Sequence, residues 1–357
     1  MLSLFYIVVC ILSVGAEPPR PSVKRLHEAT ATVLHSDLLQ NGYVRIKEVL
    51  GSNEALTWGA RIYSATMKQT SSCPVVSSTS SIQHVESCKG LSGPSFIRGR
   101  QLEEVDRVIS YLTNSPDLAR IAAQVMNVSR VRLYQATSFI KHPGDAPSAW
   151  HQDAAACPLH TDKLITIWLA LDHVPPEAGP LIFARGSHLP NVPEPSLRDL
   201  SPGDRLASMK KWTTSEVKNL TGLSITRPLS LSPGDATLHL GWTLHSAPPN
   251  TGEKPRKAIA ITYFSDGARV HPDLLSLKEG RSGGSNDDAS DGSKGVAFKG
   301  EDGNNLYVQL LEDDYQTWKE WLHKRPSILI PGAPVRDSVL TPLLYDVLWD
   351  TAPGIPI

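Results

Sequence analysis

Three residues of the sequence have the types and the spacing of metal ligands. His151 and Asp153 are separated by one residue, and His245 lies much further along, at the end of an apolar run. If the stretch around His151 is an extended strand, both of its side chains project to the same side, because successive side chains alternate between faces. Two imidazoles and one carboxylate on one face of a metal leave the opposite face open. This ligand set is typical of non-haem Fe(II) oxygenases.

The order of these residues resembles the phytanoyl-CoA dioxygenase family of Fe(II)- and 2-oxoglutarate-dependent oxygenases. The resemblance covers residues 36 to about 270 and rests on the His-x-Asp pair, the distal His245 and Arg256 after it. A Gly-containing turn at 177–181 and a Gly-Ser-His motif ending at His188 also match. It implies bound Fe(II), 2-oxoglutarate as cosubstrate and ascorbate as an optional reductant. It also implies a Fe(II)-dependent dioxygenase that hydroxylates a small organic or lipid-like substrate and releases succinate and CO2.

His239 is the alternative third ligand, because it too follows an apolar run in a strand-like sequence. We favour His245 because Asn250 and Arg256 follow it as the family pattern requires. His188 is expected to be structural and to bond a turn backbone. The presence of Asp153 favours hydroxylation, since halogenating relatives carry a small residue at that position.

Arg256 is the expected anchor for the distal carboxylate of 2-oxoglutarate. It begins a predicted strand with the parity of Ala258 and Ala260, whose small side chains leave room for a ligand. A planar guanidinium binds a carboxylate through two parallel hydrogen bonds, which Lys257 could not do. The alternative for Arg256 is a surface cation after Lys254.

The resemblance places Trp168 and Lys141 near the cosubstrate as well. On the predicted strand 163–174, Trp168 shares one face with Thr166, while the isoleucines and leucines between them share the other. Gln135 has the parity of Lys141 on the strand before and is a further cosubstrate candidate. Ordinary strand polarity is the alternative for Gln135 and Lys141.

The elements that position these residues change character near residue 127. Before it, apolar periodicity and capping residues predict helices at 27–39, 102–112 and 116–126 and a strand at 42–47. A further helix is predicted to begin at Ser52, with Leu56, Ala60, Tyr63 and Met67 on one face. After it, strands are predicted at 131–141, 148–153, 163–174, 181–184, 229–231, 235–240, 245–247 and 257–264. Many short strands with Pro-Gly turns predict a mainly β fold with flanking helices and a double-stranded β-helix, the jelly-roll or cupin-like core.

We therefore expect one oxygenase domain over 17–357. Its parts are a helical N-terminal region at about 27–126, the jelly-roll core at about 131–265, a polar insertion at 280–305 and a C-terminal helical tail at 306–357, which includes a helix at 315–323. The segment 71–93 is expected to be a loop that helps to cover the site. Residues 1–16 are apolar and end in small residues, which predicts a secretory signal peptide. An uncleaved anchor or an organellar leader is the alternative.

This leader predicts a location in the lumen of the secretory pathway or outside the cell. Asn127 and Asn219 lie in sequons and would then be glycosylation acceptors. Cys73 and Cys88 would either form a disulfide bond or remain free thiols, and Cys157 is expected to be a small buried side chain.

The net charge of −1 gives no long-range field that would attract nucleic acid, so we expect small-molecule ligands. No second hydrophobic span follows residues 1–16, so we expect no transmembrane span in the mature chain. We also expect a monomer. Two other functions remain open from the residues alone. One is a cupin-like binding protein without redox turnover, and the other is a metal-dependent hydrolase or isomerase that uses the same three ligands.

Overall fold

The computed structural model describes residues 20–71, 90–93, 96–155, 157–190, 192, 198, 200, 213–271 and 343–346. The predicted leader at 1–16, the Cys73/Cys88 pair, the insertion at 280–305 and the helix at 315–323 lie outside the described residues. No helix within these ranges is long and apolar enough to cross a bilayer.

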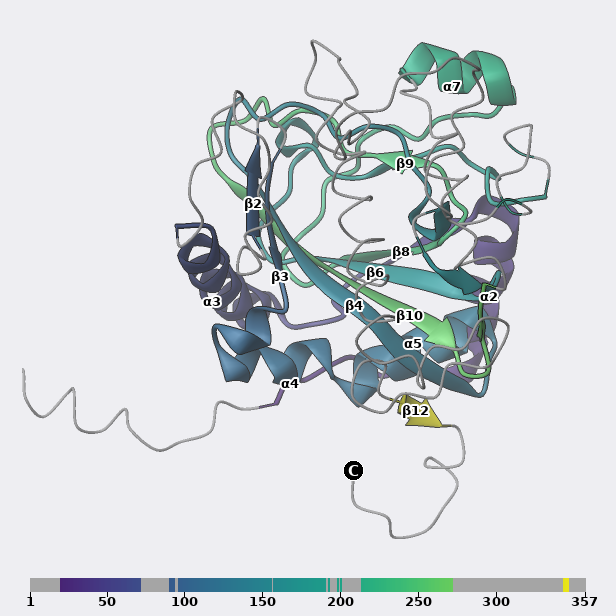
Figure 1. Ribbon diagram of the computed structural model, residues 1–357, viewed down its shortest axis with the longest axis horizontal. Helices are drawn as coiled ribbons and strands as arrows, with labels where there is room; N and C mark the ends of the chain where they lie inside the picture. Colours follow the sequence, from purple (N-terminus) through teal and green to yellow (C-terminus); the bar gives the residue numbers. More distant parts are fainter. Residues whose placement is uncertain are drawn as a thin grey trace, which may run out of the picture.

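One antiparallel eight-stranded sheet forms the centre of the molecule (Figure 1). In spatial order it contains β1 (Tyr43–Ile46), β8 (Ala236–Leu240), β6 (Leu164–Ala170), β10 (Arg256–Ser265), β4 (Arg130–Lys141), β3 (Phe96–Arg100) and β2 (Gly90–Gly93), and β12 (Leu343–Asp346) also pairs with β4. Two smaller sheets join β5 (Leu159–His160) to β11 (Arg269–Val270) and β7 (Ile182–Phe183) to β9 (His245–Ser246). This antiparallel architecture confirms the predicted fold class. The short strand β12 falls in the tail that was predicted to be helical, and that prediction is wrong for 343–346.

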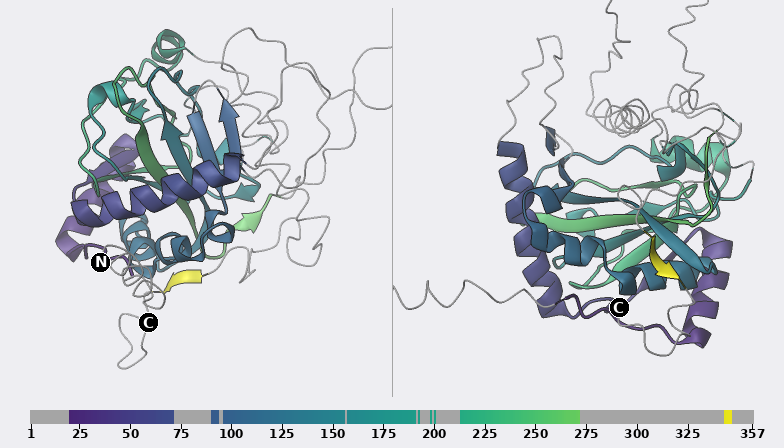
Figure 2. Two further views of the ribbon diagram at one scale, coloured as in Figure 1. Left: turned by 90° about the vertical axis from the view of Figure 1, so that its left-hand side faces the viewer. Right: turned by 60° about the horizontal axis from the view of Figure 1, so that its bottom comes forward.

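Helices cover one face of the sheet, whereas β9 and the short helix α7 lie on the opposite side (Figures 1 and 2). The longer helices are α2 (Glu28–Asn41), α3 (Ser52–Ser71) and α5 (Pro116–Met126), and the short ones are α4 (Ser110–Thr113) and α7 (Thr214–Thr221). Single turns of 3-10 helix are η1 (Leu102–Glu104), η2 (Arg107–Ile109), η3 (Asp153–Ala155) and η4 (Pro176–Ala178). At the start of α5, the Ser115 hydroxyl accepts a hydrogen bond from the Leu118 amide and Pro116 occupies the first turn, as the sequence predicts.

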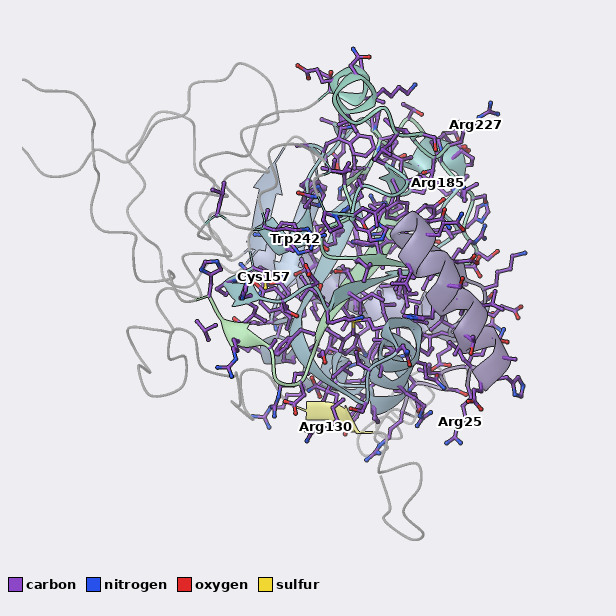
Figure 3. The ribbon with its side chains drawn as sticks, turned by 90° about the vertical axis from the view of Figure 1, so that its right-hand side faces the viewer. Arg25, Arg130, Cys157, Arg185, Arg227 and Trp242 are labelled. Carbon is purple, nitrogen blue, oxygen red and sulfur yellow. The ribbon has the colours of Figure 1, made fainter. Side chains whose placement is uncertain are left out.

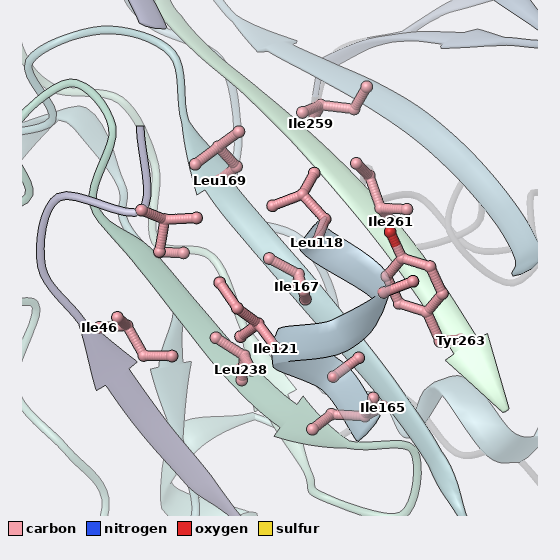
Figure 4. Packing of buried hydrophobic residues seen from close by; sticks show 14 of the residues in the cluster. Ile46, Leu118, Ile121, Ile165, Ile167, Leu169, Leu238, Ile259, Ile261 and Tyr263 are labelled. Atoms are coloured by element: carbon pink, nitrogen blue, oxygen red, sulfur yellow. The ribbon is translucent and has the colours of Figure 1, made fainter. Parts of the chain in front are cut away.

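The two faces of the central strands have different roles. On β6 the side chains of Ile165, Ile167 and Leu169 join a core cluster that also contains Leu118 and Ile121 of α5 (Figure 4). The intervening Thr166 and Trp168 face the other way and line a pocket. The alternation expected for this strand is therefore confirmed, and it separates a helix-packed face from a ligand-binding face.

The predicted helix over 102–112 is wrong, because it is divided into η1, η2 and α4. The Asp106 side chain is the physical reason. Its carboxylate accepts a hydrogen bond from the Val108 amide, which starts a new turn, and it also pairs with Arg61 of α3 at 2.6 Å. A carboxylate that caps a turn in this way competes with continuation of the helix.

The face of α3 that packs against the core is not the one that carries Leu56, Ala60, Tyr63 and Met67. Leu56 is 42% exposed, whereas Ala55, Trp58 and Ile62 are buried. Gly59 allows this face to approach the sheet closely: a Cβ atom placed there would lie 2.4 Å from the backbone oxygen of Leu171.

Gly59→Ala is therefore expected to destabilise the protein. In an exposed helix this change gains about 1 kcal/mol, but overpacking against a backbone atom costs about 1–3 kcal/mol, and here the clash should prevail. Denaturant unfolding should show a lower free energy of unfolding for Gly59→Ala. The control Ala60→Ser, on the exposed face of the same helix, should stay within about 0.5 kcal/mol of the parent. Equal stability of Gly59→Ala and the parent would contradict this packing.

Three further residues from the sequence analysis lie within the described ranges. Asn127 and Asn219 are both exposed, so both sequons are accessible, and their glycosylation stays a prediction. The Cys157 side chain is buried, as expected. Figure 3 shows Cys157 and Trp242 on the same side of the molecule, with Arg25 and Arg227 projecting at its edge.

Candidate metal centre

Backbone pairing brings His151 and His245 together. Each residue's amide donates to the other's carbonyl oxygen at 3.0 Å, so the two form an isolated antiparallel bridge. Directly opposite residues of an antiparallel pair project to the same face. The two imidazole rings accordingly lie with their centres 3.9 Å apart.

Asp153 lies beside His151 and His245, but the backbone that places it there is a turn and not the predicted strand. The predicted strand over 148–153 is wrong, because only His151 forms a bridge and Asp153 begins the 3-10 turn η3. The amide of Ala154 donates to the carbonyl of Gly241, which holds this turn against the end of β8. Asp153 Oδ1 lies 3.6 Å from Nε2 of His151 and 3.6 Å from Nε2 of His245.

These three residues form a compact set of metal donors, with ligand atoms that all lie within 4.8 Å of one another. Nδ1 of His151 is 2.9 Å from the carbonyl oxygen of Ala149, and Nδ1 of His245 is 2.9 Å from that of Thr243. Each carbonyl therefore accepts a hydrogen bond from the Nδ1–H group, which leaves the Nε2 lone pair available on the side of Asp153. A backbone acceptor for the second ring nitrogen is the usual support of a metal-binding histidine.

The electrostatics of the site suit a divalent cation. Burial lowers the pKa of His151 to about 4, although the charge of Asp153 opposes this, and burial also lowers the pKa of His245 well below its ordinary value. Burial alone would raise the pKa of Asp153, but His245, His239 and His151 together bring it below its ordinary value. Two neutral imidazoles and one ionised carboxylate result. This donor set and its charge fit Fe(II).

A pocket opens over these residues. Arg256 and Trp168 line it together with the three donors, as the sequence analysis expects. Arg256 is only 3% exposed, its Nη2 donates to the carbonyl of Gly179 at 3.1 Å, and its guanidinium lies 5.1 Å from the centre of the Trp168 ring. The remaining lining residues are Phe96, Phe139, Ser148, Thr166, Leu181, His239, Ala247 and Ala260.

The other two cosubstrate candidates are not among these lining residues. Lys141 is fully buried, and its Nζ donates to the carbonyl oxygens of Ala247 and Pro248 at 3.2 and 2.7 Å. Burial, with the nearby charge of Arg256, lowers the pKa of Lys141 to about 6. Lys141 thus braces the segment that follows His245. Gln135 is half-buried, and its Oε1 lies 3.5 Å from a guanidinium nitrogen of Arg100.

Asn250 completes the support of the connection between His245 and Arg256. Its side-chain amide donates to the carbonyls of Lys141 and Lys254, both at 2.9 Å, and the residue is fully buried. The metal donor and the arginine are therefore joined by one short, hydrogen-bonded segment.

Two histidines that the sequence analysis weighed have other partners. His239 Nε2 lies 3.1 Å from Oδ2 of Asp153, and His239 does not belong to the donor set whose atoms are mutually close. His188 Nε2 lies 3.0 Å from the carbonyl oxygen of Leu39, as expected for a structural residue.

Sequence reasoning missed the support of Asp153 and the apolar wall of the pocket. The hydroxyl of Thr166 donates to Asp153 Oδ2 at 2.7 Å, and its parity with Trp168 was the available signal. Phe96 and Phe139, with ring centres 5.5 Å apart, come from neighbouring strands. Phe96 lies on β3, which no sequence pattern indicated.

An antiparallel β fold that places two imidazoles and one carboxylate in a pocket beside a buried arginine is that of the Fe(II)- and 2-oxoglutarate-dependent oxygenases. Residues 38–258, more than half of the chain, match the family described as phytanoyl-CoA dioxygenase. The chain belongs to this family, which confirms the predicted resemblance. Together with the donor set, this membership assigns Fe(II) and 2-oxoglutarate to the site.

Comparison with characterised proteins finds two related bacterial enzymes. One is the methylphosphonate hydroxylase of Gimesia maris, 29% identical over 131 residues, which cover 37% of this chain and 44% of that protein. The other is the 2-aminoethylphosphonate dioxygenase of the uncultured bacterium HF130_AEPn_1, 29% identical over 144 residues, which cover 40% and 49%. The chain spans less than half the length of these relatives.

Among solved structures, the non-heme alpha ketoglutarate dependent epimerase SnoN from nogalamycin biosynthesis is similar. It has a TM-score of 0.52 and 23% identity, with 77% of this chain and 95% of that chain covered. This likeness supports the jelly-roll fold.

Proposed function

We propose that this protein is an Fe(II)- and 2-oxoglutarate-dependent dioxygenase that hydroxylates a small organic or lipid-like substrate, with release of succinate and CO2. One observation carries the proposal: the three donors and Arg256 line the same pocket. A metal-dependent hydrolase or a cupin-like binding protein would use the donors but has no use for a buried guanidinium beside them.

When bound, Fe(II) and 2-oxoglutarate supply the oxidising chemistry, and the side chains of the pocket supply binding and placement. His151, His245 and Asp153 would hold the metal. Arg256 would pair with the distal carboxylate of 2-oxoglutarate, because its guanidinium is buried and held at one end by the carbonyl of Gly179. Burial lowers the pKa of Arg256 to about 10, so it stays charged at neutral pH.

The apolar wall favours a substrate with a hydrocarbon part. Phe96, Phe139 and Leu181 line the pocket and would keep water from the reacting carbon. The related enzymes are named for phosphonates. Methylphosphonate and 2-aminoethylphosphonate therefore belong among the small substrates to be tested, beside fatty-acid derivatives.

The purified full chain, loaded anaerobically with Fe(II) and then given ascorbate, 2-oxoglutarate and air, is expected to form succinate. Slow formation should occur without substrate and should rise when the correct substrate is added. A chelator should abolish it, because the metal would be removed. Succinate can be measured by mass spectrometry.

The two other functions give different results in this assay. A binding protein would bind ligands but form no succinate, and a hydrolase or isomerase would convert a substrate without 2-oxoglutarate. Absence of succinate, together with no binding of 2-oxoglutarate by the Fe(II)-loaded protein, would contradict the proposal.

A further inference from the structure

A row of buried polar side chains crosses three neighbouring strands beneath Asp153. His239 of β8 is the direct cross-strand partner of Thr166 of β6, which is in turn the partner of Thr262 of β10. Directly opposite residues lie on the same face of a sheet. The side chains of all three are 4% exposed or less. Buried polar side chains are expected to have hydrogen-bond partners, and this row of side chains leads to the carboxylate of Asp153.

The direction of each hydrogen bond in this row follows from the number of protons available. Thr166 has one hydroxyl proton, which it donates to Asp153 Oδ2 at 2.7 Å. It must therefore accept the hydrogen bond that joins it to the Thr262 hydroxyl at 2.9 Å. Thr262 therefore donates to Thr166, and Thr166 donates to Asp153.

His239 supplies a second donor to the same oxygen atom. Its Nε2 lies 3.1 Å from Asp153 Oδ2. Its Nδ1 is buried and has no hydrogen-bond partner within the described ranges. A histidine protonated only on Nδ1 would leave that proton without an acceptor, so Nε2 carries a proton. That proton points to the carboxylate.

Asp153 therefore has two unlike oxygen atoms. Oδ2 accepts hydrogen bonds from Thr166 and His239, whereas Oδ1 faces Nε2 of His151 and of His245 at 3.6 Å. Only Oδ1 is left for a metal.

We infer that His239 and Thr166 are positioning residues that hold Asp153 as a ligand through one oxygen. The inference deepens the proposed function and rests on it. Two histidines and one carboxylate that each bind through a single atom would leave positions at the metal open for 2-oxoglutarate and dioxygen. If Asp153 turned and bound through both oxygens, it would occupy a position that the reaction needs.

The test measures metal binding to the apo form of the full chain, with no 2-oxoglutarate or substrate present. His239→Leu removes the donor, whereas His239→Gln keeps an N–H donor on a side chain of similar reach. Anaerobic calorimetric titration with Mn(II) and Fe(II) should show about 10- to 100-fold weaker binding for His239→Leu, which is the usual effect of losing such a partner. His239→Gln should stay within about threefold of the parent.

Thr166→Val and Thr166→Ser form a second, independent pair. The valine variant should weaken metal binding as His239→Leu does, and the serine variant should restore it, because serine keeps the hydroxyl. The matched control is His188→Leu, which removes a buried histidine that bonds the Leu39 carbonyl and leaves Asp153 untouched. Its metal affinity should stay within about twofold, and circular dichroism should confirm that each variant is folded.

Folded His239→Leu protein with the parent's affinity would overturn the inference. So would equal losses for His239→Leu and His239→Gln, since these would mean that the imidazole itself binds the metal. If metal affinities follow the expected order but succinate is never formed, the positioning role stands and the proposed function fails. The two failures are thus distinguishable.

Discussion

The Asp153→Ala protein is expected to bind Fe(II) about 100- to 4000-fold more weakly than the parent and to form no measurable succinate. Asp153 is the only anionic member of the donor set, and its Oδ1 faces both histidines. Removing one member of a buried, hydrogen-bonded charge arrangement costs about 3–5 kcal/mol, and each 1.4 kcal/mol is tenfold in affinity. Anaerobic titration gives the affinity, and mass spectrometry gives the succinate.

The control for this change is Asp37→Ala on the exposed side of α2, which also removes one carboxylate from the protein. It should leave metal affinity and turnover unchanged. Asp153→Asn is a stricter comparison, because it keeps the shape and removes the charge, and it too should lose most of the metal affinity. Parent-like Fe(II) binding by folded Asp153→Ala protein would contradict the assigned donor set.

Arg256→Leu is expected to raise the KM for 2-oxoglutarate by about 30- to 1000-fold and to change metal affinity little. The truncation removes a buried cation that would pair with the distal carboxylate, which costs about 2–4 kcal/mol, and it leaves the three donors intact. Arg256→Lys should recover only part of the loss, because a lysine offers a point charge in place of a planar fork. Steady-state kinetics with varied 2-oxoglutarate measures the effect.

The neighbouring cation is the matched control. Lys257 pairs with Asp172 at 2.8 Å, on the opposite side of the strand from Arg256. Lys257→Leu removes one positive charge from the next position and should leave the KM for 2-oxoglutarate unchanged. If Arg256→Leu and Lys257→Leu behaved alike, the pocket would not use Arg256 as a carboxylate anchor.

Strand periodicity predicted the face of β6 correctly because its two faces have different chemistry. Ile165, Ile167 and Leu169 pack against helices, and Thr166 and Trp168 line the pocket. The same reasoning placed Arg256 on a face with small side chains. Where one face of a strand packs on an apolar layer and the other lines a ligand site, the alternation of residue types in the sequence shows which side chains belong to each face.

The errors in the predicted secondary structure came from local hydrogen bonds, which apolar periodicity does not indicate. Asp106 divides a predicted helix because its carboxylate caps the turn at Val108. The segment before Asp153 was expected to be a strand, but it ends in η3. His151 and Asp153 still converge, because the turn and the bridge to His245 together replace the expected alternation.

The role of His239 could not be read from the sequence at all. It depends on the register between β6 and β8, which pairs residues more than 70 positions apart. Sequence alone shows a histidine on an apolar strand and invites a choice between ligand and core residue. The strand register indicates a third role, in which His239 supports the carboxylate of Asp153, the proposed metal ligand.

The connection from His245 to Arg256 carries both a metal donor and the arginine, and Lys141 and Asn250 fasten it to the neighbouring strand. The relative position of His245 and Arg256 is therefore set within one short, hydrogen-bonded segment. Phe96 and Leu181 of the pocket wall come from other parts of the chain, so substitutions there could change which substrate fits without moving the metal donor or the arginine.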